Sequence, residues 1–212
     1  MPRLTSSRPI ELLPFVAKMS KHLHQDDISQ MTPEDMRAYC AAAPNYIDER
    51  DDFGYTPLLA ACVKGNTEAV RVLLDAGSDP NFVAPDGETP LNVAISLRGE
   101  ACSHVLLDML LAAGANLNAG FTPPLRLAVV RGLRDLVVHL VERGADPNFE
   151  DGDGSPPLFA AGVYGGHPDV KMMGLLIKLG ADITRCDGVG QTLADRIGPD
   201  AMREVMRHAT PD

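Results

Sequence analysis

The chain has 212 residues, enough for one domain or two small ones, and its 45% hydrophobic and 23% charged residues are ordinary for a globular protein. Its formal net charge of −10 argues against nucleic acid or an anionic membrane as the main partner and favours a basic protein surface. Apolar runs stay shorter than the ~18 residues of a membrane span, and the first residues do not read as a signal peptide. We therefore expect a cytoplasmic protein.

The N-terminal stretch is predicted to form a divergent pair of helices within residues 10–44. Apolar residues at helical spacing indicate the first helix: Phe15, Met19 and Leu23. The phrase Thr32-Pro-Glu-Asp35 is typical of a capped helix start and leads into the second helix, with apolar Met36, Tyr39 and Cys40.

Two phrases then alternate four times in fixed order. The first phrase reads Gly54-Tyr-Thr-Pro-Leu-Leu-Ala-Ala61, Gly87-Glu-Thr-Pro-Leu-Asn-Val-Ala94, Phe121-Thr-Pro-Pro-Leu-Arg-Leu-Ala128 and Gly154-Ser-Pro-Pro-Leu-Phe-Ala-Ala161. The second phrase places paired apolar residues three and four positions before a glycine: Gly77, Gly114, Gly144 and Gly180. Thr56 and Thr89 lie 33 residues apart, so the chain is built from internal repeats.

Each phrase has a structural explanation. Thr56 and Thr89 are placed to cap a helix N-terminus, and Pro57 and Pro90 fit the first helical position, which needs no N–H. The glycine of the second phrase is expected to end a second helix in the left-handed conformation. The Asp, Asn and Pro residues that follow it predict a turn into the next repeat.

These phrases resemble the ankyrin repeat, a unit of about 33 residues with a β-turn and two helices. The resemblance covers residues 48–184, with a degraded last copy, Asp187-Gly-Val-Gly-Gln-Thr-Leu-Ala194. It implies an all-α ankyrin repeat solenoid of stacked helix-turn-helix units with projecting hairpin-like finger loops.

The predicted organisation has three parts. Residues 1–47 form an N-terminal divergent helical cap, and residues 48–185 hold four repeats. Residues 186–212 form a degenerate fifth repeat and a C-terminal cap, because a solenoid needs terminal units with a polar outer face. The last helix is expected to start at Pro199 and to carry Met202, Val205 and Met206.

The sequence departs from the family pattern in two respects. The histidine of the Thr-Pro-Leu-His phrase is replaced by Leu59, Asn92, Arg126 and Phe159, so a hydrogen bond from that histidine between repeats is expected to be missing. The second repeat is longer, with 25 residues from Thr89 to Gly114 against 21 from Thr56 to Gly77. We place this insertion around Arg98 to His104, lengthening either the turn between the helices or the outer helix.

The sequence patterns that could indicate metal binding, disulfides or catalysis are weak. His22 and His24 lie two apart and do not share a helix face, and the four cysteines (Cys40, Cys62, Cys102 and Cys186) occur singly, which predicts reduced, mostly buried thiols. The stretch from Asp151 to Pro156 superficially resembles a calcium loop but has proline where that loop needs glycine. We therefore predict no enzyme, no metal and no cofactor.

In the ankyrin family, partners bind the concave face made by finger loops and first helices. Carried over position by position, that resemblance assigns these partner-binding candidates: Asp52, Phe53, Tyr55, Lys64, Asp86, Glu88, Leu97, Arg98, Phe121, Arg131, Asp153, Ser155, Tyr164 and Gln191. Aromatic anchors within a charged surround are common in binding patches. Two alternatives stay open: the acids serve the turns, or the aromatics pack between neighbouring fingers.

The functional hypothesis is a non-enzymatic protein-binding module, monomeric when free, that holds a basic partner. A narrower version is an inhibitor or immunity-type protein that occludes a toxin or enzyme. Another class of function is an assembly or structural subunit that acts through self-association.

Overall fold

The structure, a computed structural model, describes residue 28 and residues 31–97, 100–163 and 167–210. Its backbone contacts divide the chain into two compact units, Met1–Ala115 and Asn116–Asp212. The predicted first helix of the N-terminal pair lies outside the described residues, as do His22 and His24. The three-part organisation predicted above stays a prediction.

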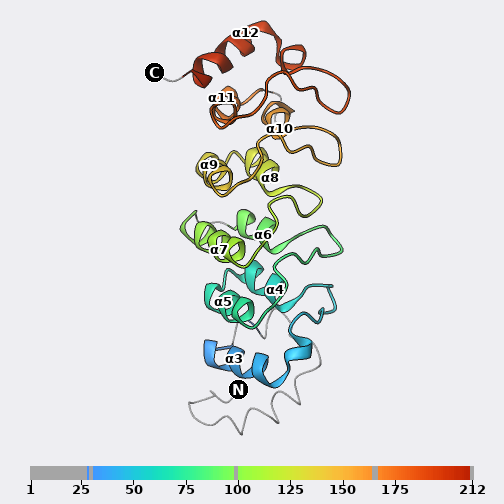
Figure 1. Cartoon of the computed structure of the whole chain (residues 1–212), viewed down its shortest axis with the longest axis vertical. Helices are drawn as coiled ribbons and strands as arrows, with labels where there is room; N and C mark the ends of the chain where they lie inside the picture. Colours follow the sequence, from blue (N-terminus) through green and yellow to red (C-terminus); the bar gives the residue numbers. More distant parts are fainter. Residues whose placement is uncertain (1–27, 29–30, 98–99, 164–166, 211–212) are drawn as a thin grey trace. The chain divides into compact units, whose positions relative to one another are not determined.

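The first unit contains helix pairs. Its elements are α3 (Pro33–Ala42), the 3-10 turn η1 (Pro44–Tyr46), α4 (Pro57–Lys64), α5 (Thr67–Asp75), α6 (Pro90–Ser96) and α7 (Glu100–Ala112). Helix α4 packs on α5 and α6 packs on α7, while α4 contacts α6 and α5 contacts α7. Two rows of helices result within this unit, with α3 packed on α5 (Figure 1).

The second unit repeats this arrangement. Its helices are α8 (Pro124–Val130), α9 (Arg134–Glu142), α10 (Pro157–Val163), α11 (Val170–Lys178) and α12 (Leu193–Ala209). Helices α8 and α10 lie side by side and each packs on the helix that follows it. Helix α12 closes the unit by packing on α11 and α10. The prediction of an all-helical fold is confirmed, since the described residues form only an isolated bridge between Cys186 and Thr192 beyond helices and loops.

The helix ends follow the predicted chemistry. The hydroxyls of Thr56 and Thr89 accept the N–H groups of Leu59 and Asn92, three residues into each helix. Thr32 forms a reciprocal capping box with Asp35 at the start of α3. The second-phrase glycines have φ between 90° and 100°, the left-handed region where a side chain would be strained.

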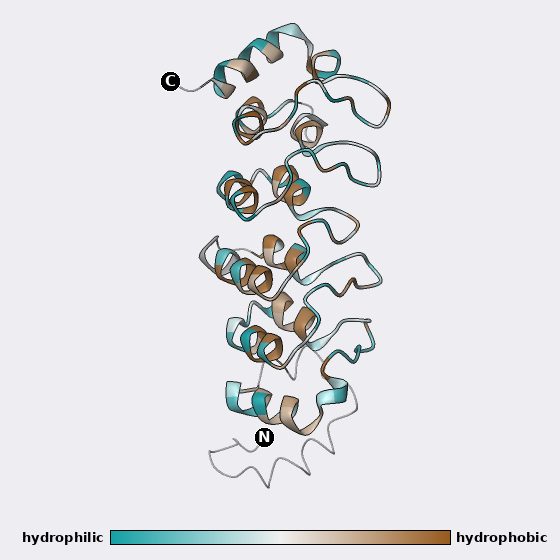
Figure 2. Cartoon of the chain, viewed as in Figure 1, coloured by the Kyte–Doolittle hydropathy of each residue, from teal (hydrophilic) through white to brown (hydrophobic). Residues whose placement is uncertain are grey.

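The core lies between the two rows of each unit. Leu58, Leu73, Leu91 and Leu107 of the first unit are fully buried, or nearly so. Each such leucine contributes about 2 kcal/mol relative to an exposed one. Figure 2 shows the hydrophobic residues concentrated in the paired helices. Within the described ranges, no helix is both long and apolar enough to cross a membrane.

The insertion lengthens the outer helix, one of the two predicted outcomes. Helix α7 has 13 residues, whereas α5, α9 and α11 have nine each. Asparagines of the turns link neighbouring repeats. The Nδ2 groups of Asn81 and Asn148 donate to the carbonyls of Gly114 and Gly180, each at 3.0 Å.

The last helical segment starts at Pro199 as predicted, but it follows a short segment within the same helix, α12. Gly198 is non-helical within α12, and the final segment follows from Pro199. Val205 is buried, but Met206 is 38% exposed, so Met206 does not belong to the core as its spacing suggested. Cys40 and Cys62 are buried free thiols, whereas Cys186 is exposed, because it lies in the loop leading to the last finger.

Candidate functional site

The long loops between repeats project to one side of the helix pairs in each unit (Figure 1). We call these loops fingers. Three of them turn around an aspartate that lies three residues before a glycine: Asp51, Asp151 and Asp187. In each, Oδ1 accepts the N–H groups two and four residues later, at 2.9–3.2 Å. The predicted finger turn at Asp151 is therefore formed, which explains the glycines that resemble a calcium loop.

The other oxygen of these aspartates has different surroundings. Oδ2 of Asp151 accepts a guanidinium N–H of Arg126, and Oδ2 of Asp187 accepts from Nε of Arg196 at 2.6 Å. Oδ2 of Asp51 is buried and has no hydrogen-bond partner in the part of the chain that the structure describes. Among the described residues, the first finger thus differs from the last two because no arginine pairs with Oδ2 of its aspartate.

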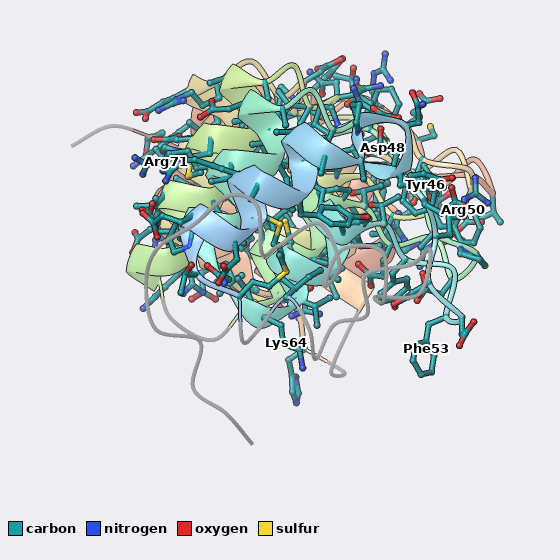
Figure 3. All side chains as sticks on the ribbon, turned by 90° about the horizontal axis from the view of Figure 1, so that it is seen from below. Tyr46, Asp48, Arg50, Phe53, Lys64 and Arg71 are labelled. Carbon is teal, nitrogen blue, oxygen red and sulfur yellow. The ribbon has the colours of Figure 1, made fainter. Side chains whose placement is uncertain are left out.

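The finger tips present apolar side chains to solvent. Phe53 is 73% exposed, Phe121 74% and Val189 75%. Figure 3 shows Phe53 pointing away from the ribbon, while Tyr46, Asp48 and Arg50 lie on the stretch that leads to this finger. Packing between fingers, the alternative explanation for the aromatics, therefore does not hold for Phe53 or Phe121.

Tyr55 does link two fingers. Its hydroxyl donates to Oδ2 of Asp86 at 2.5 Å. This hydrogen bond is the main cause that raises the pKa of Tyr55 to about 12, with burial and the charges of nearby acids adding to it. The same bond lowers the pKa of Asp86 from its ordinary value.

We expect the replacement Asp86→Ala to lower the pKa of one tyrosine from about 12 toward the ordinary value near 10. Because the folded pKa lies above the unfolded one, the bond stabilises the fold below about pH 10 and its contribution is lost as pH rises toward 12. An ultraviolet absorbance titration of the tyrosines measures this. Tyr39 is the internal control, since burial is the main cause that raises its pKa to about 12. An unchanged titration would show that the Tyr55–Asp86 bond does not form in solution.

The second unit has hollows beside its fingers. One of about 400 Å³ is lined by Arg126, Asp153, Ser155, Val189 and Arg196, among others. A neighbouring hollow of about 280 Å³ brings Phe121 beside Arg126 and Asp153. Three predicted residues (Phe121, Asp153 and Ser155) thus lie at adjoining hollows.

The predicted candidates fall into groups by exposure. Exposed are Asp52, Phe53, Lys64, Asp86, Phe121, Arg131, Asp153 and Gln191. Partly buried are Tyr55, Glu88, Leu97 and Ser155. Arg98 and Tyr164 lie outside the described residues. The candidates divide between the two units.

The acids of the fingers serve two purposes. Asp51, Asp86, Asp151 and Asp187 accept backbone N–H groups, so the alternative that acids serve the turns holds for them. Asp52 and Asp153 are exposed, and neither side chain has a hydrogen bond or ion pair within the described ranges. These two acids are therefore available to a partner.

Sequence reasoning missed Arg126 and Arg196, which line the hollow of the second unit. Arg126 occupies the position of the family's histidine, and that departure was the available signal. Elsewhere among the described side chains, no group of three or more His, Cys, Asp or Glu could hold a metal ion.

Comparison with known proteins assigns the family. A family model described as ankyrin repeats (3 copies) matches residues 30–120. The structure resembles the crystal structure of an ankyrin repeat domain from Acinetobacter baumannii AYE, with a TM-score of 0.68 and 26% identity, covering 83% of this chain and 91% of that one. The chain belongs to the ankyrin repeat family. Ankyrin repeats are protein–protein interaction modules and typically non-enzymatic.

Curated relatives of this ankyrin repeat protein are diverse. The mouse B-cell lymphoma 3 protein homolog is 30% identical over 65% of this chain and 31% of its own length. The probable 26S proteasome regulatory subunit p28 of Saccharomyces cerevisiae is 32% identical over 71% of this chain and 66% of its own length. The chain thus spans less than a third of the mouse relative and about two thirds of the yeast one.

Proposed function

We propose that this ankyrin repeat protein is a non-enzymatic binding module that holds a protein partner with a basic surface on its fingers and first helices. One observation carries the proposal. Each unit exposes a phenylalanine at a finger tip together with an aspartate that has no side-chain partner among the described residues: Phe53 with Asp52, and Phe121 with Asp153.

The chemistry of this surface favours a cationic partner. An exposed phenylalanine supplies apolar contact area at the centre of a patch, and unpaired carboxylates beside it attract positive charge. The net charge of −10 adds long-range attraction for a basic partner and repulsion for nucleic acid. We further propose that the free protein is a monomer and acts in the cytoplasm.

Two narrower roles use the same surface. An inhibitor or immunity-type protein would use this surface to cover a toxin or enzyme. An assembly or structural subunit would use it for self-association. Both stay predictions, although the yeast relative's name, a probable proteasome regulatory subunit, is compatible with membership of an assembly.

The charge reversals Asp52→Lys and Asp153→Lys, made together, should abolish capture of the partner from the source cell. Both side chains are exposed and unpaired within the described ranges, so the fold should remain intact. Affinity capture followed by mass spectrometry, with circular dichroism as the folding check, measures the effect.

A matched control reverses two exposed acids on second helices, Asp75→Lys in α5 and Glu142→Lys in α9. This control changes the net charge equally but leaves the fingers untouched, so capture should persist. If the finger variant and the control retain the partner equally, the proposed surface is wrong.

A further inference from the structure

The first finger holds a buried carboxylate whose charge is not matched within the described residues. Asp51 is 6% exposed, and its Oδ2 has no hydrogen-bond partner there. Burying an ionised carboxylate without a cation is unfavourable, and a cation brought by another molecule would recover that free energy.

The fingers built around Asp151 and Asp187 show which group pairs with the second carboxylate oxygen. All three aspartates use Oδ1 in the same way, for the two backbone N–H groups of the turn. In the second unit, Oδ2 of Asp151 and Oδ2 of Asp187 each accept from an arginine. In these two fingers, the turn therefore places Oδ2 where a guanidinium of the same unit reaches it.

At the two matching sequence positions, the chain has no arginine for Asp51. Arg196 follows Asp187 by nine residues, and the residue nine after Asp51 is Ala60. Arg126 precedes Asp151 by 25 residues, and the residue 25 before Asp51 is an acid, Asp26. The adjacent Arg50 stacks on Phe82, with its guanidinium carbon 4.9 Å from the ring centre.

We infer that an arginine of the protein partner pairs with Oδ2 of Asp51 and completes the first finger in the way that Arg126 and Arg196 complete the others. This inference rests on the proposed function and names the chemistry of the partner. The flanking Asp52 and Phe53 are exposed, so the turn lies at the surface. Arginine is favoured over lysine because its planar fork matches carboxylate geometry.

The test uses two capped peptides that differ only in carrying arginine or lysine between glycines. Amide signals of Phe53 and Tyr55 report directly, because these N–H groups donate to the same carboxylate. In an NMR titration, the arginine peptide should shift them saturably and bind more tightly than the lysine peptide. Asp51→Asn should weaken arginine binding about tenfold or more, since a charge-assisted bond is lost.

Asp51→Asn keeps Oδ1 as the acceptor for both N–H groups, so the turn should survive. If it does not, Asp51→Ala serves instead, because Ala84 occupies this place in the second finger and the backbone turn still closes there. Asp75→Asn is the matched control and should leave arginine binding unchanged, because this exposed aspartate lies on α5, outside the fingers.

Binding unchanged in Asp51→Asn, equal binding of the two peptides, or no binding of the arginine peptide would each overturn the inference. These outcomes are distinguishable from failure of the proposed function. If reversal of Asp52 and Asp153 still abolishes partner capture, the surface is correct and only the assignment to Asp51 is wrong.

Discussion

Replacing Arg126 by alanine should lower the free energy of unfolding by about 3 kcal/mol. The side chains of Arg126 and Asp151 are only 17% and 6% exposed, so the variant leaves a nearly buried carboxylate without its cation. Breaking one half of a buried pair is costly for this reason, even where the intact pair contributes little net stability. Urea unfolding followed by circular dichroism measures the loss.

The second replacement Asp151→Asn should recover part of the loss caused by Arg126→Ala. An asparagine removes the buried charge and still accepts the two N–H groups of the finger turn through Oδ1. The four proteins form a double-mutant cycle whose coupling energy isolates the pair.

A matched control is Arg203→Ala, which removes an arginine from an ion pair in the same unit. The side chains of Arg203 and Asp200 are 73% and 90% exposed, so this variant should change stability by less than about 1 kcal/mol. Equal effects of Arg126→Ala and Arg203→Ala would mean that the Arg126–Asp151 pair is solvated in solution.

The fold was predictable because its determinants are local in the sequence. A threonine followed by proline begins α4 and α6 as expected, and the glycine after each second helix adopts a positive φ. These signals need only neighbouring residues, so they survive where the family's histidine is lost. The insertion was located correctly, but whether it lengthened the turn or α7 depended on packing that the sequence does not show.

The candidate surface was only partly predictable, because its pairs join residues distant in the chain. The position of Phe53 and Phe121 on fingers followed from the repeat, and their exposure agrees with it. The use of Arg126 by the finger that follows it could not be read from spacing, since an arginine at a helix position can face several neighbours. That Oδ2 of Asp51 has no arginine partner among the described residues could be recognised only by comparison with Asp151 and Asp187, which each pair with one.

The replacement Gly188→Ala should destabilise the packing of the last two fingers by about 2 kcal/mol. A Cβ on Gly188 would lie 1.9 Å from the carbonyl oxygen of Asp153 and 3.1 Å from its carbon. Both atoms belong to the backbone, so a finger must move as a whole to relieve the contact. Hydrogen exchange at the Gly188 N–H, which donates to Oγ of Ser155 at 3.2 Å, should accelerate.

Gly152→Ala is the control for this replacement, because it lies in the same pair of fingers and a Cβ there would meet nothing within 4 Å. It should leave stability unchanged. Since Ser155 and Gly188 both line the hollow of about 400 Å³, separating the fingers should also weaken binding of the proposed partner, if it uses this hollow. Unchanged stability and exchange in Gly188→Ala would show that the fingers are not in contact at this point. Loss of stability with unchanged partner affinity would instead place the partner's contacts away from this hollow, on the tips at Phe121 or on the first unit.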